Sequence, residues 1–204
     1  MTVRVKVCGV TRLEDALLAA RLGADAIGLN LWPGSRRFVA PDAAREIVAR
    51  LPPFVSAIGV FVNQPPAEVV ARAAHTGVVA VQLHGDEPHA ECNGYSLPVI
   101  KALRVTGPES VADLERYRVR AFLLDAPSAG FGGSGATFDW SLAREVAQRS
   151  TVILAGGLTP ENVAEAVRVV RPLAVDVASG VESGPGLKDP DKLARFIARA
   201  KESA

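Results

Sequence analysis

Short β-branched runs alternate along the chain with stretches in which apolar residues recur at helical spacing. Loops containing glycine, proline or aspartate separate them, and this unit occurs eight times. The runs predict strands at Val3–Cys8, Ala26–Leu31, Ser56–Val62, Val79–His84, Val99–Leu103, Ala121–Asp125, Val152–Ala155 and Ala174–Ala178. The stretches between them predict helices at about Leu13–Leu22, Pro41–Leu51, Pro66–Ala74, Pro88–Cys92, Pro108–Tyr117, Trp140–Arg149, Pro160–Val170 and Pro190–Lys201.

This alternation predicts a parallel sheet of the α/β class. Eight successive units favour closure into a (β/α)8 TIM barrel, because the alternative, an open flavodoxin-like sheet, normally needs only five. Six predicted helices begin at a proline, which suits the first helical turn. No low-complexity linker interrupts the series, so residues 1–204 are expected to form a single (β/α)8-barrel domain.

The predicted strands each have an apolar face and a polar face, because successive side chains point to opposite faces. In the first predicted strand Val3, Val5 and Val7 share one face, whereas Lys6 and Cys8 share the other. The fourth, sixth and eighth strands repeat the pattern, and their second face carries Gln82, His84, Asp125 and Asp176. We expect the apolar faces to pack on the helices and the polar faces to converge in the barrel lumen.

Composition narrows the class of partner and the cellular setting. Lysine and arginine total 23 against 22 aspartate and glutamate, a net charge of +1, so we expect no nucleic-acid or membrane partner. Two cysteines make neither a disulfide framework nor a zinc-ligand pair, which favours a cytoplasmic protein. The first residues lack a signal-peptide core, and no stretch reaches the 18 or so apolar residues of a membrane span.

Candidate chemistry lies at the strand ends, where barrels build their active sites. Cys8, His84, Asp125 and Asp176 would meet at one rim as an acid/base site. Only three histidines occur, too few for a multi-histidine metal centre, so no metal is expected.

Two glycine-containing loops predict an anion site. Gly156 and Gly157 follow the seventh strand, and Ser179 and Gly180 follow the eighth, the usual phosphate position in such barrels. Glycines let backbone N–H groups approach an oxyanion closely. In the competing interpretation the glycines only make a tight turn, and Thr159 caps the next helix.

Seven segments, in order from the first strand to the last, resemble phosphoribosylanthranilate isomerase of tryptophan biosynthesis. They are Lys6-Val7-Cys8-Gly9-Val10-Thr11, Gly34-Ser35-Arg36-Arg37-Phe38, Gly59-Val60-Phe61-Val62-Asn63, Val81-Gln82-Leu83-His84-Gly85, Gly132-Gly133-Ser134-Gly135-Ala136-Thr137-Phe138-Asp139-Trp140, Ala155-Gly156-Gly157-Leu158 and Asp176-Val177-Ala178-Ser179-Gly180-Val181-Glu182.

The resemblance implies an Amadori rearrangement of the small molecule phosphoribosylanthranilate, without metal or redox cofactor. By similarity, Asp125 is the general acid and Cys8 the general base. A free aspartate is ionised at neutral pH and a free cysteine is mostly thiol. The acid role therefore requires burial or a hydrogen bond, and the base role requires a thiolate stabilised by positive charge, for which Lys6 has the right parity.

The same resemblance gives roles to the rest of the predicted site. Arg37 would hold the anthranilate carboxylate through a bidentate guanidinium, although its neighbour Arg36 could exchange roles with it. His84 would line the substrate pocket, and Asp176 would contact substrate hydroxyl groups. The segment Ala126–Ala136 would form a loop that closes over the substrate, or else a plain surface loop.

Each of these residues also has an alternative interpretation as a structural residue without a catalytic or substrate-binding role. Cys8 would be a small buried hydrophobe, as we expect for Cys92, and Asp125 a cap or loop salt bridge. His84 would only form a hydrogen bond within a loop, and Asp176 would have only a structural role in the barrel lumen.

Two other functions and two assembly states compete. The chain would be another phosphate-binding barrel enzyme, such as indole-glycerol-phosphate synthase or a sugar-phosphate epimerase, or a non-catalytic sensor of a phosphorylated ligand. A sensor has no need for both Cys8 and Asp125, so their joint presence favours an enzyme. Monomer and homodimer are equally compatible with the sequence.

Overall fold

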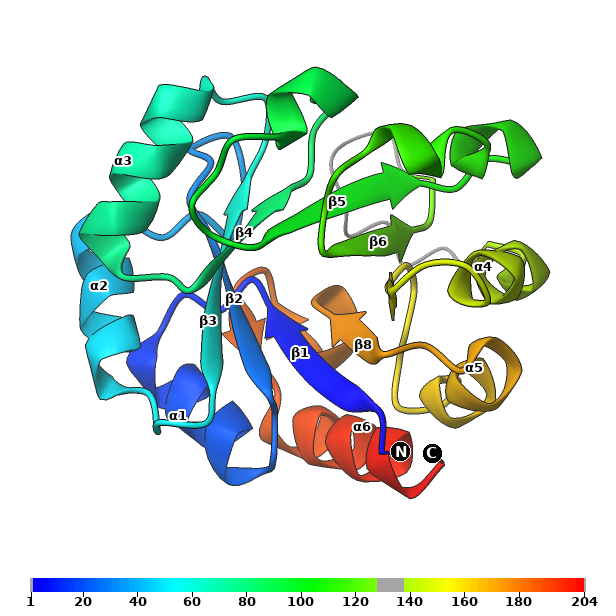
Figure 1. The fold of residues 1–204 in the computed structure, drawn as a ribbon. Helices are drawn as coiled ribbons and strands as arrows, with labels where there is room; N and C mark the ends of the chain where they lie inside the picture. The colour runs from blue at the N-terminus through cyan, green and yellow to red at the C-terminus, as the bar shows by residue number, and fades with distance from the viewer. Residues whose placement is uncertain (1, 128–137, 204) are drawn as a thin grey trace.

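The computed structural model describes residues 2–127 and 138–203, and it confirms the predicted (β/α)8 barrel. Eight parallel strands pair in sequence order, and the eighth pairs with the first to close the ring. Figure 1 shows the strands around the centre with helices outside them. The strands are β1 (Arg4–Cys8), β2 (Ala26–Asn30), β3 (Ser56–Phe61), β4 (Ala80–Leu83), β5 (Val99–Arg104), β6 (Ala121–Asp125), β7 (Val152–Leu154) and β8 (Ala174–Val177).

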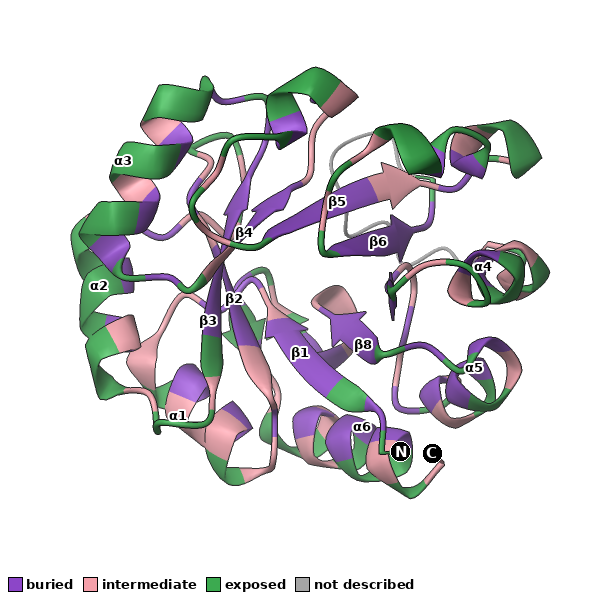
Figure 2. Ribbon diagram, in the orientation of Figure 1, coloured by how far each residue is buried: buried purple, intermediate pink, exposed green. Residues whose placement is uncertain are grey.

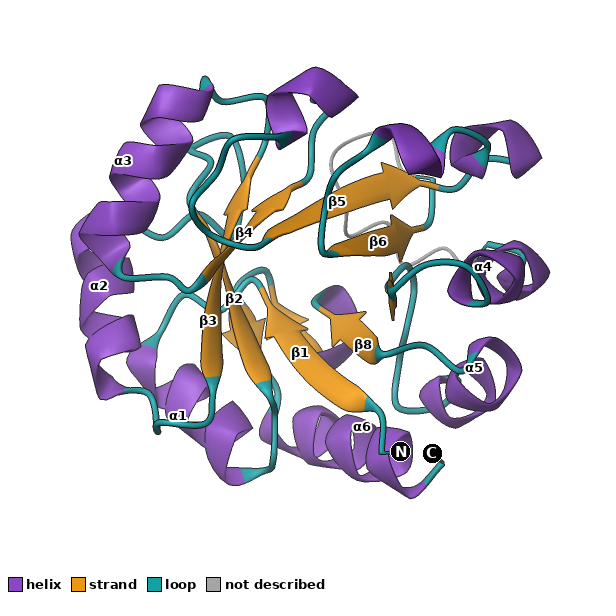
Figure 3. Ribbon diagram, viewed as in Figure 1, coloured by secondary structure: helices purple, strands orange, loops and turns teal. Residues whose placement is uncertain are grey.

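The described residues form six α-helices on the outside of the barrel (Figure 3). They are α1 (Leu13–Arg21), α2 (Pro41–Arg50), α3 (Pro66–Thr76), α4 (Trp140–Ala147), α5 (Val163–Val170) and α6 (Pro190–Glu202). Three of them, α2, α3 and α6, start at the proline that the sequence indicates. None of the described helices is long and apolar enough to cross a membrane.

The prediction of a helix at Pro108–Tyr117 is wrong. The segment forms two short 3-10 helices, η2 (Pro108–Val111) and η3 (Leu114–Arg116). Its backbone hydrogen bonds join residues three apart in the chain, as from Ser110 N to Gly107 O at 3.1 Å. The Ser110 hydroxyl donates to the same carbonyl, and such local side-chain bonds compete with a regular helix.

Two further helix predictions need correction. Pro88–Cys92 forms only the 3-10 helix η1 (His89–Cys92), since its length allows a single turn. The helix predicted at Pro160–Val170 begins later, because α5 starts only after Asn162. The Asn162 side chain accepts the N–H of Thr159 at 2.8 Å, which closes a turn before the helix starts.

Parity along the strands is confirmed by two separate apolar clusters. Val5 and Val7 are fully buried in the outer cluster between barrel and helices. The inner cluster fills the lumen and consists of Ile58, Ile100, Ala102, Ala121, Leu123, Ile153, Ala155 and Ala174, with Ala26 and Ala80 packed against it. Figure 2 shows most of each labelled strand as buried, with exposed or intermediate residues at some strand ends. The lumen is therefore a packed core, as barrels require.

A polar layer lies above this apolar plug. Because side chains alternate, Gln82 and Asp176 lie two residues nearer the strand ends than the plug residues Ala80 and Ala174. Lys6 pairs in register with Asp176 across β1 and β8 and is also buried. Polar side chains in the lumen thus face the carboxyl end of the barrel, where the candidate site begins.

Candidate active site

One pocket at the carboxyl end of the strands brings all nine sequence-predicted site residues together. Strand ends supply Cys8, His84, Asp125 and Asp176, and the loop after β2 supplies Arg37. The loops after β7 and β8 complete the lining with Gly156, Gly157, Ser179 and Gly180. This convergence follows from the fold, since parallel strands all end at the same rim.

Cys8 lies beside a buried ion pair. Lys6 Nζ is 2.8 Å from Asp176 Oδ1, and both side chains are almost fully buried. A Cβ on Gly28 would lie 2.8 Å from Cys8 Sγ and 3.1 Å from Lys6 Nζ, so thiol and ammonium share the space above this glycine. Burial raises the pKa of the Cys8 thiol above its ordinary value, although the Lys6 and Lys188 charges act to lower it.

A second buried lysine holds the rim beneath Cys8. Lys188 Nζ donates to the carbonyl oxygens of Cys8 at 2.6 Å and Ala178 at 3.3 Å, and to Glu182 Oε1 at 2.9 Å. It lies on a small hairpin, β9 (Glu182–Gly184) and β10 (Leu187–Lys188), inserted between β8 and α6. Burial lowers the pKa of Lys188 despite its pairing with Glu182. One ammonium thereby ties β1, the loop after β8 and the hairpin together.

Glu182 also orients Arg37. Arg37 Nε donates to Glu182 Oε1 at 2.9 Å and Nη2 donates to Oε2 at 2.7 Å, a bidentate pair. Burial disfavours the Glu182 carboxylate, yet the hydrogen bonds from Arg37 and the charge of Lys188 hold its pKa below the ordinary value. One edge of the guanidinium is thus occupied, and among the described residues no acceptor contacts Nη1. Arg36 is exposed and lies outside the pocket.

Asp125 and His84 are in direct contact. His84 Nε2 lies 3.2 Å from Asp125 Oδ2, and Asp125 Oδ1 accepts the N–H of Ala126 at 2.9 Å. Asp125 is buried at the end of β6, with only 7% of the residue exposed. Gln82 Nε2 lies 2.7 Å from the other ring nitrogen, His84 Nδ1. Asp125 therefore lies at the end of a chain of polar groups that starts at buried Gln82 and passes through partly exposed His84.

The two glycine loops approach each other closely at the predicted phosphate position. Gly156 and Gly157 adopt positive φ angles of 79° and 62°. Gly180 has no room for a side chain, because a Cβ there would collide with the carbonyl of Leu158. Within the described residues no acceptor occupies the N–H groups of Gly157, Ser179 or Gly180. Three free donors on two adjoining loops can bind an oxyanion.

Sequence reasoning missed several groups that shape this site. Glu182 was visible at the end of a matched segment, and the parity of β4 places Gln82 in the lumen, but neither signal revealed a contact. Lys188 gave no signal, because its carbonyl partner at Cys8 is 180 residues away along the chain. Asn30 and Ser35 line the pocket as well. Of the predicted closing loop Ala126–Ala136, residues 128–136 lie outside the described residues.

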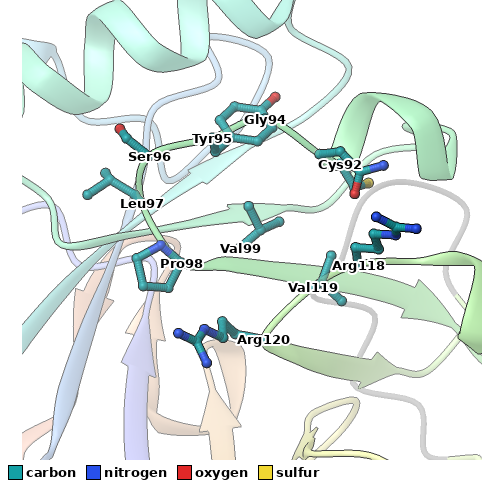
Figure 4. Close-up of a pocket in the computed structure, with 11 residues that line it drawn as sticks. Cys92, Gly94, Tyr95, Ser96, Leu97, Pro98, Val99, Arg118, Val119 and Arg120 are labelled. Atoms are coloured by element: carbon teal, nitrogen blue, oxygen red, sulfur yellow. The ribbon is translucent and has the colours of Figure 1, made fainter.

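A separate recess lies at the opposite end of the barrel, where β5 and β6 begin (Figure 4). Tyr95, Pro98, Arg118 and Arg120 line it together with Cys92. Burial raises the pKa of the Cys92 thiol to about 11, so this thiol is unreactive at neutral pH. Across residues 2–127 and 138–203, no group of three or more His, Cys, Asp or Glu side chains could hold a metal ion.

Comparison with known proteins gives a consistent result. Residues 5–199 match the family model of N-(5'-phosphoribosyl)anthranilate (PRA) isomerase. The chain is 51% identical over 206 residues to N-(5'-phosphoribosyl)anthranilate isomerase of Myxococcus xanthus, covering 98% of this chain and 97% of the relative. It superposes on the crystal structure of phosphoribosyl anthranilate isomerase from Thermotoga maritima with a TM-score of 0.93 and 47% identity, covering 98% and 99% of the two chains.

A third similar protein was solved with a ligand. A phosphoribosyl anthranilate isomerase in complex with reduced 1-(o-carboxyphenylamino)-1-deoxyribulose 5-phosphate has a TM-score of 0.87 and 44% identity, covering 98% of this chain and 99% of that one. The molecule in that complex carries both a phosphate and an aryl carboxylate.

The pKa of Cys8 gives a testable pH dependence. Because burial raises this pKa, the thiolate fraction at any pH is smaller than in free cysteine, and alkylation by iodoacetamide should reach half its maximal rate at higher pH. Lys6→Met removes a charge that favours the thiolate, so it should move this midpoint further upward. Peptide mass spectrometry, with Lys201→Met as a remote control, measures the rate at Cys8. A midpoint below that of free cysteine would contradict the burial argument.

Proposed function

Because the chain belongs to the N-(5'-phosphoribosyl)anthranilate isomerase family, and is thus an isomerase of tryptophan biosynthesis, we propose that Cys8 and Asp125 perform its two proton transfers. The observation that carries the proposal is the position of both residues, with Arg37 and the two glycine loops, around one pocket. The substrate is then phosphoribosylanthranilate, and the reaction is an Amadori rearrangement.

Asp125 is assigned the acid step. The bond between C1 and the furanose ring oxygen breaks, its electron pair stays on that oxygen, and Asp125 gives the oxygen a proton. The nitrogen lone pair of the substrate forms a C1=N bond, so the ring opens to an iminium ion. Burial of Asp125 supports this role, because it keeps water from replacing the carboxyl group as proton donor.

Cys8 is assigned the base step. Its thiolate takes the proton from C2, the C–H electron pair forms C1=C2, and the C1=N electrons return to nitrogen. The resulting enolamine then loses its hydroxyl proton at C2 and gains one at C1, which yields the ketose. A raised pKa makes the thiolate scarce but strongly basic, while Lys6 and Lys188 supply the positive charge that the role requires.

The ends of the substrate are assigned to two fixed sites. The anthranilate carboxylate binds the edge of Arg37 that Glu182 leaves open, and the phosphate binds the free N–H groups at Gly157, Ser179 and Gly180. Gly156 lets the first loop turn at positive φ. Asp176 offers its second carboxylate oxygen to a sugar hydroxyl, while the first holds Lys6. Anchoring at both ends fixes C1 and C2 between acid and base.

Separate variants test the two catalytic assignments. Cys8→Ser and Asp125→Asn should each lower kcat by roughly 10²–10⁴-fold, because each removes one proton-transfer group while nearly keeping its shape. Loss of anthranilate fluorescence from freshly generated phosphoribosylanthranilate measures turnover. Cys92→Ser is the matched control and should retain full activity. A wild type that binds the substrate without converting it would instead favour a sensor, and full activity in either variant would refute that residue's role.

The phosphate assignment has its own test. A Cβ on Gly180 would collide with the Leu158 carbonyl and push the two loops apart, so Gly180→Ala should raise KM about tenfold or more and change kcat less. Inorganic phosphate should inhibit the wild type competitively and the variant more weakly. Gly94→Ala is the control, because a Cβ on Gly94 would have no neighbour within 4 Å and Gly94 lies outside the pocket. Equal phosphate inhibition of wild type and Gly180→Ala would contradict the assignment.

A further inference from the structure

Gln82 lies in the lumen directly behind the proposed acid. It is fully buried on β4, in register with Val60 of β3 and Ile100 of β5. Its amide nitrogen is 2.7 Å from Nδ1 of His84, whose Nε2 is 3.2 Å from Asp125. A line of three side chains therefore runs from buried Gln82 through partly exposed His84 to buried Asp125, and the proposed mechanism uses only Asp125.

One atom of this line is unexplained. Gln82 Oε1 is buried and has no hydrogen-bond partner among the described residues. Turning the amide by 180° would exchange Oε1 and Nε2, and the amide nitrogen would then be the group without a partner. Since either orientation leaves one amide group unpaired, the surroundings favour neither strongly. The orientation is then decided by whether His84 Nδ1 carries a proton.

The orientation of the Gln82 amide depends on the number of protons that the His84–Asp125 pair holds. When the amide nitrogen donates to Nδ1, that nitrogen has no proton, and the single ring proton on Nε2 points at an ionised Asp125. An acid ready to protonate the substrate needs one more proton on the His84–Asp125 pair. In both forms of that state, imidazolium beside carboxylate or neutral imidazole beside carboxylic acid, Nδ1 carries a proton and needs an acceptor.

We propose that Gln82 is a positioning residue whose amide turns to match the proton content of the His84–Asp125 pair. The amide nitrogen faces Nδ1 when the pair holds one proton, and Oε1 faces Nδ1 when it holds two. The amide thereby stabilises the pair both before and after Asp125 donates its proton, while the His84 ring stays in one position. The inference rests on the proposed acid role of Asp125 and extends it to the reloading of that acid.

The amide is suited to this task because it carries a donor and an acceptor of nearly equal size on one carbon. Methionine would offer neither, and an ionised glutamate would offer only acceptors. Other charged or titratable groups lie around the pair on several elements. Cys8 on β1, Arg37 after β2 and Asp176 on β8 line the same pocket, and Lys6 on β1 is paired with Asp176. Arg104 on β5 is in register with Asp125 and is paired with Asp86 after β4.

The closing experiment follows the two ring nitrogens of His84 by nitrogen-15 NMR of the whole protein as the pH is changed. The chain has three histidines, and His84→Gln identifies the signals. In the wild type the neutral ring should carry its proton on Nε2, and the second proton should appear on Nδ1 as the pH falls. In Gln82→Glu the introduced carboxylate favours the protonated ring, so the midpoint should rise by about one pH unit or more.

Kinetics supply the second readout. Gln82→Met removes both partners of Nδ1, so it should lower kcat by roughly 10–100-fold and leave KM within about threefold, and the neutral ring should then populate both tautomers. Gln64→Met is the matched control, because Gln64 is a second buried glutamine whose Oε1 has no partner in the described part of the chain, but it lies outside the pocket. It should leave both kcat and the His84 signals unchanged.

The outcomes separate this inference from the proposed function. A neutral wild-type ring with its proton on Nδ1, or Gln82 variants that titrate and turn over like the wild type, would overturn the role of Gln82. Full activity in Asp125→Asn would instead remove the acid assignment, whatever the NMR result. If one Gln82 variant fails to fold, the other and the wild-type titration still decide the question.

Discussion

Three lysine ammonium groups are buried near the carboxyl end of the barrel, and each must be paired because an isolated buried charge is strongly destabilising. Lys6 pairs with Asp176 at 2.8 Å, Lys101 with Glu87 at 2.6 Å and Lys188 with Glu182 at 2.9 Å. No side chain in these pairs exposes more than 7% of its surface. The rest of the site is arranged around these pairs.

Each pair fixes a different part of the rim. Lys188 binds the carbonyl of Cys8, and its partner Glu182 holds Arg37, so the same hairpin sets the position of both the proposed base and the proposed carboxylate-binding residue. Lys101 binds the carbonyl of Gly85, which fixes the backbone next to His84. Lys6 places a positive charge beside the thiol. Removing one partner of any pair should therefore disturb a rim segment as well as the pair itself.

The sequence pattern predicted the architecture well, because burial forces its own periodicity onto strands. All eight strands lie where the β-branched runs indicate, and parity correctly assigned Lys6, Gln82 and Asp176 to the lumen. The predictions of α-helices in the fourth and fifth units were wrong, since proline and apolar spacing do not show whether a short segment can complete an α-helical turn. Strand ends and glycine loops predicted eight of the nine site residues, because a barrel places all strand ends at one rim, whereas Arg37 was predicted only from the family resemblance.

What the sequence did not predict are contacts between residues far apart in the chain. Nothing near Lys188 indicates that its ammonium reaches Cys8, and nothing near Arg37 indicates that Glu182 occupies one edge of its guanidinium. The contact from Gln82 to His84 joins residues only two apart, yet it depends on ring orientation that the pattern does not encode.

The proposed mechanism requires one pocket to hold both ends of the substrate and to place C1 and C2 between Asp125 and Cys8. A crystal structure of this chain with the reduced product analogue tests it most directly. We expect the phosphate on the N–H groups of Gly157 and Gly180, the aryl carboxylate on Arg37, and C2 about 3–3.5 Å from Cys8 Sγ. A ligand bound in the reverse direction, or with C2 out of reach of Sγ, would contradict it.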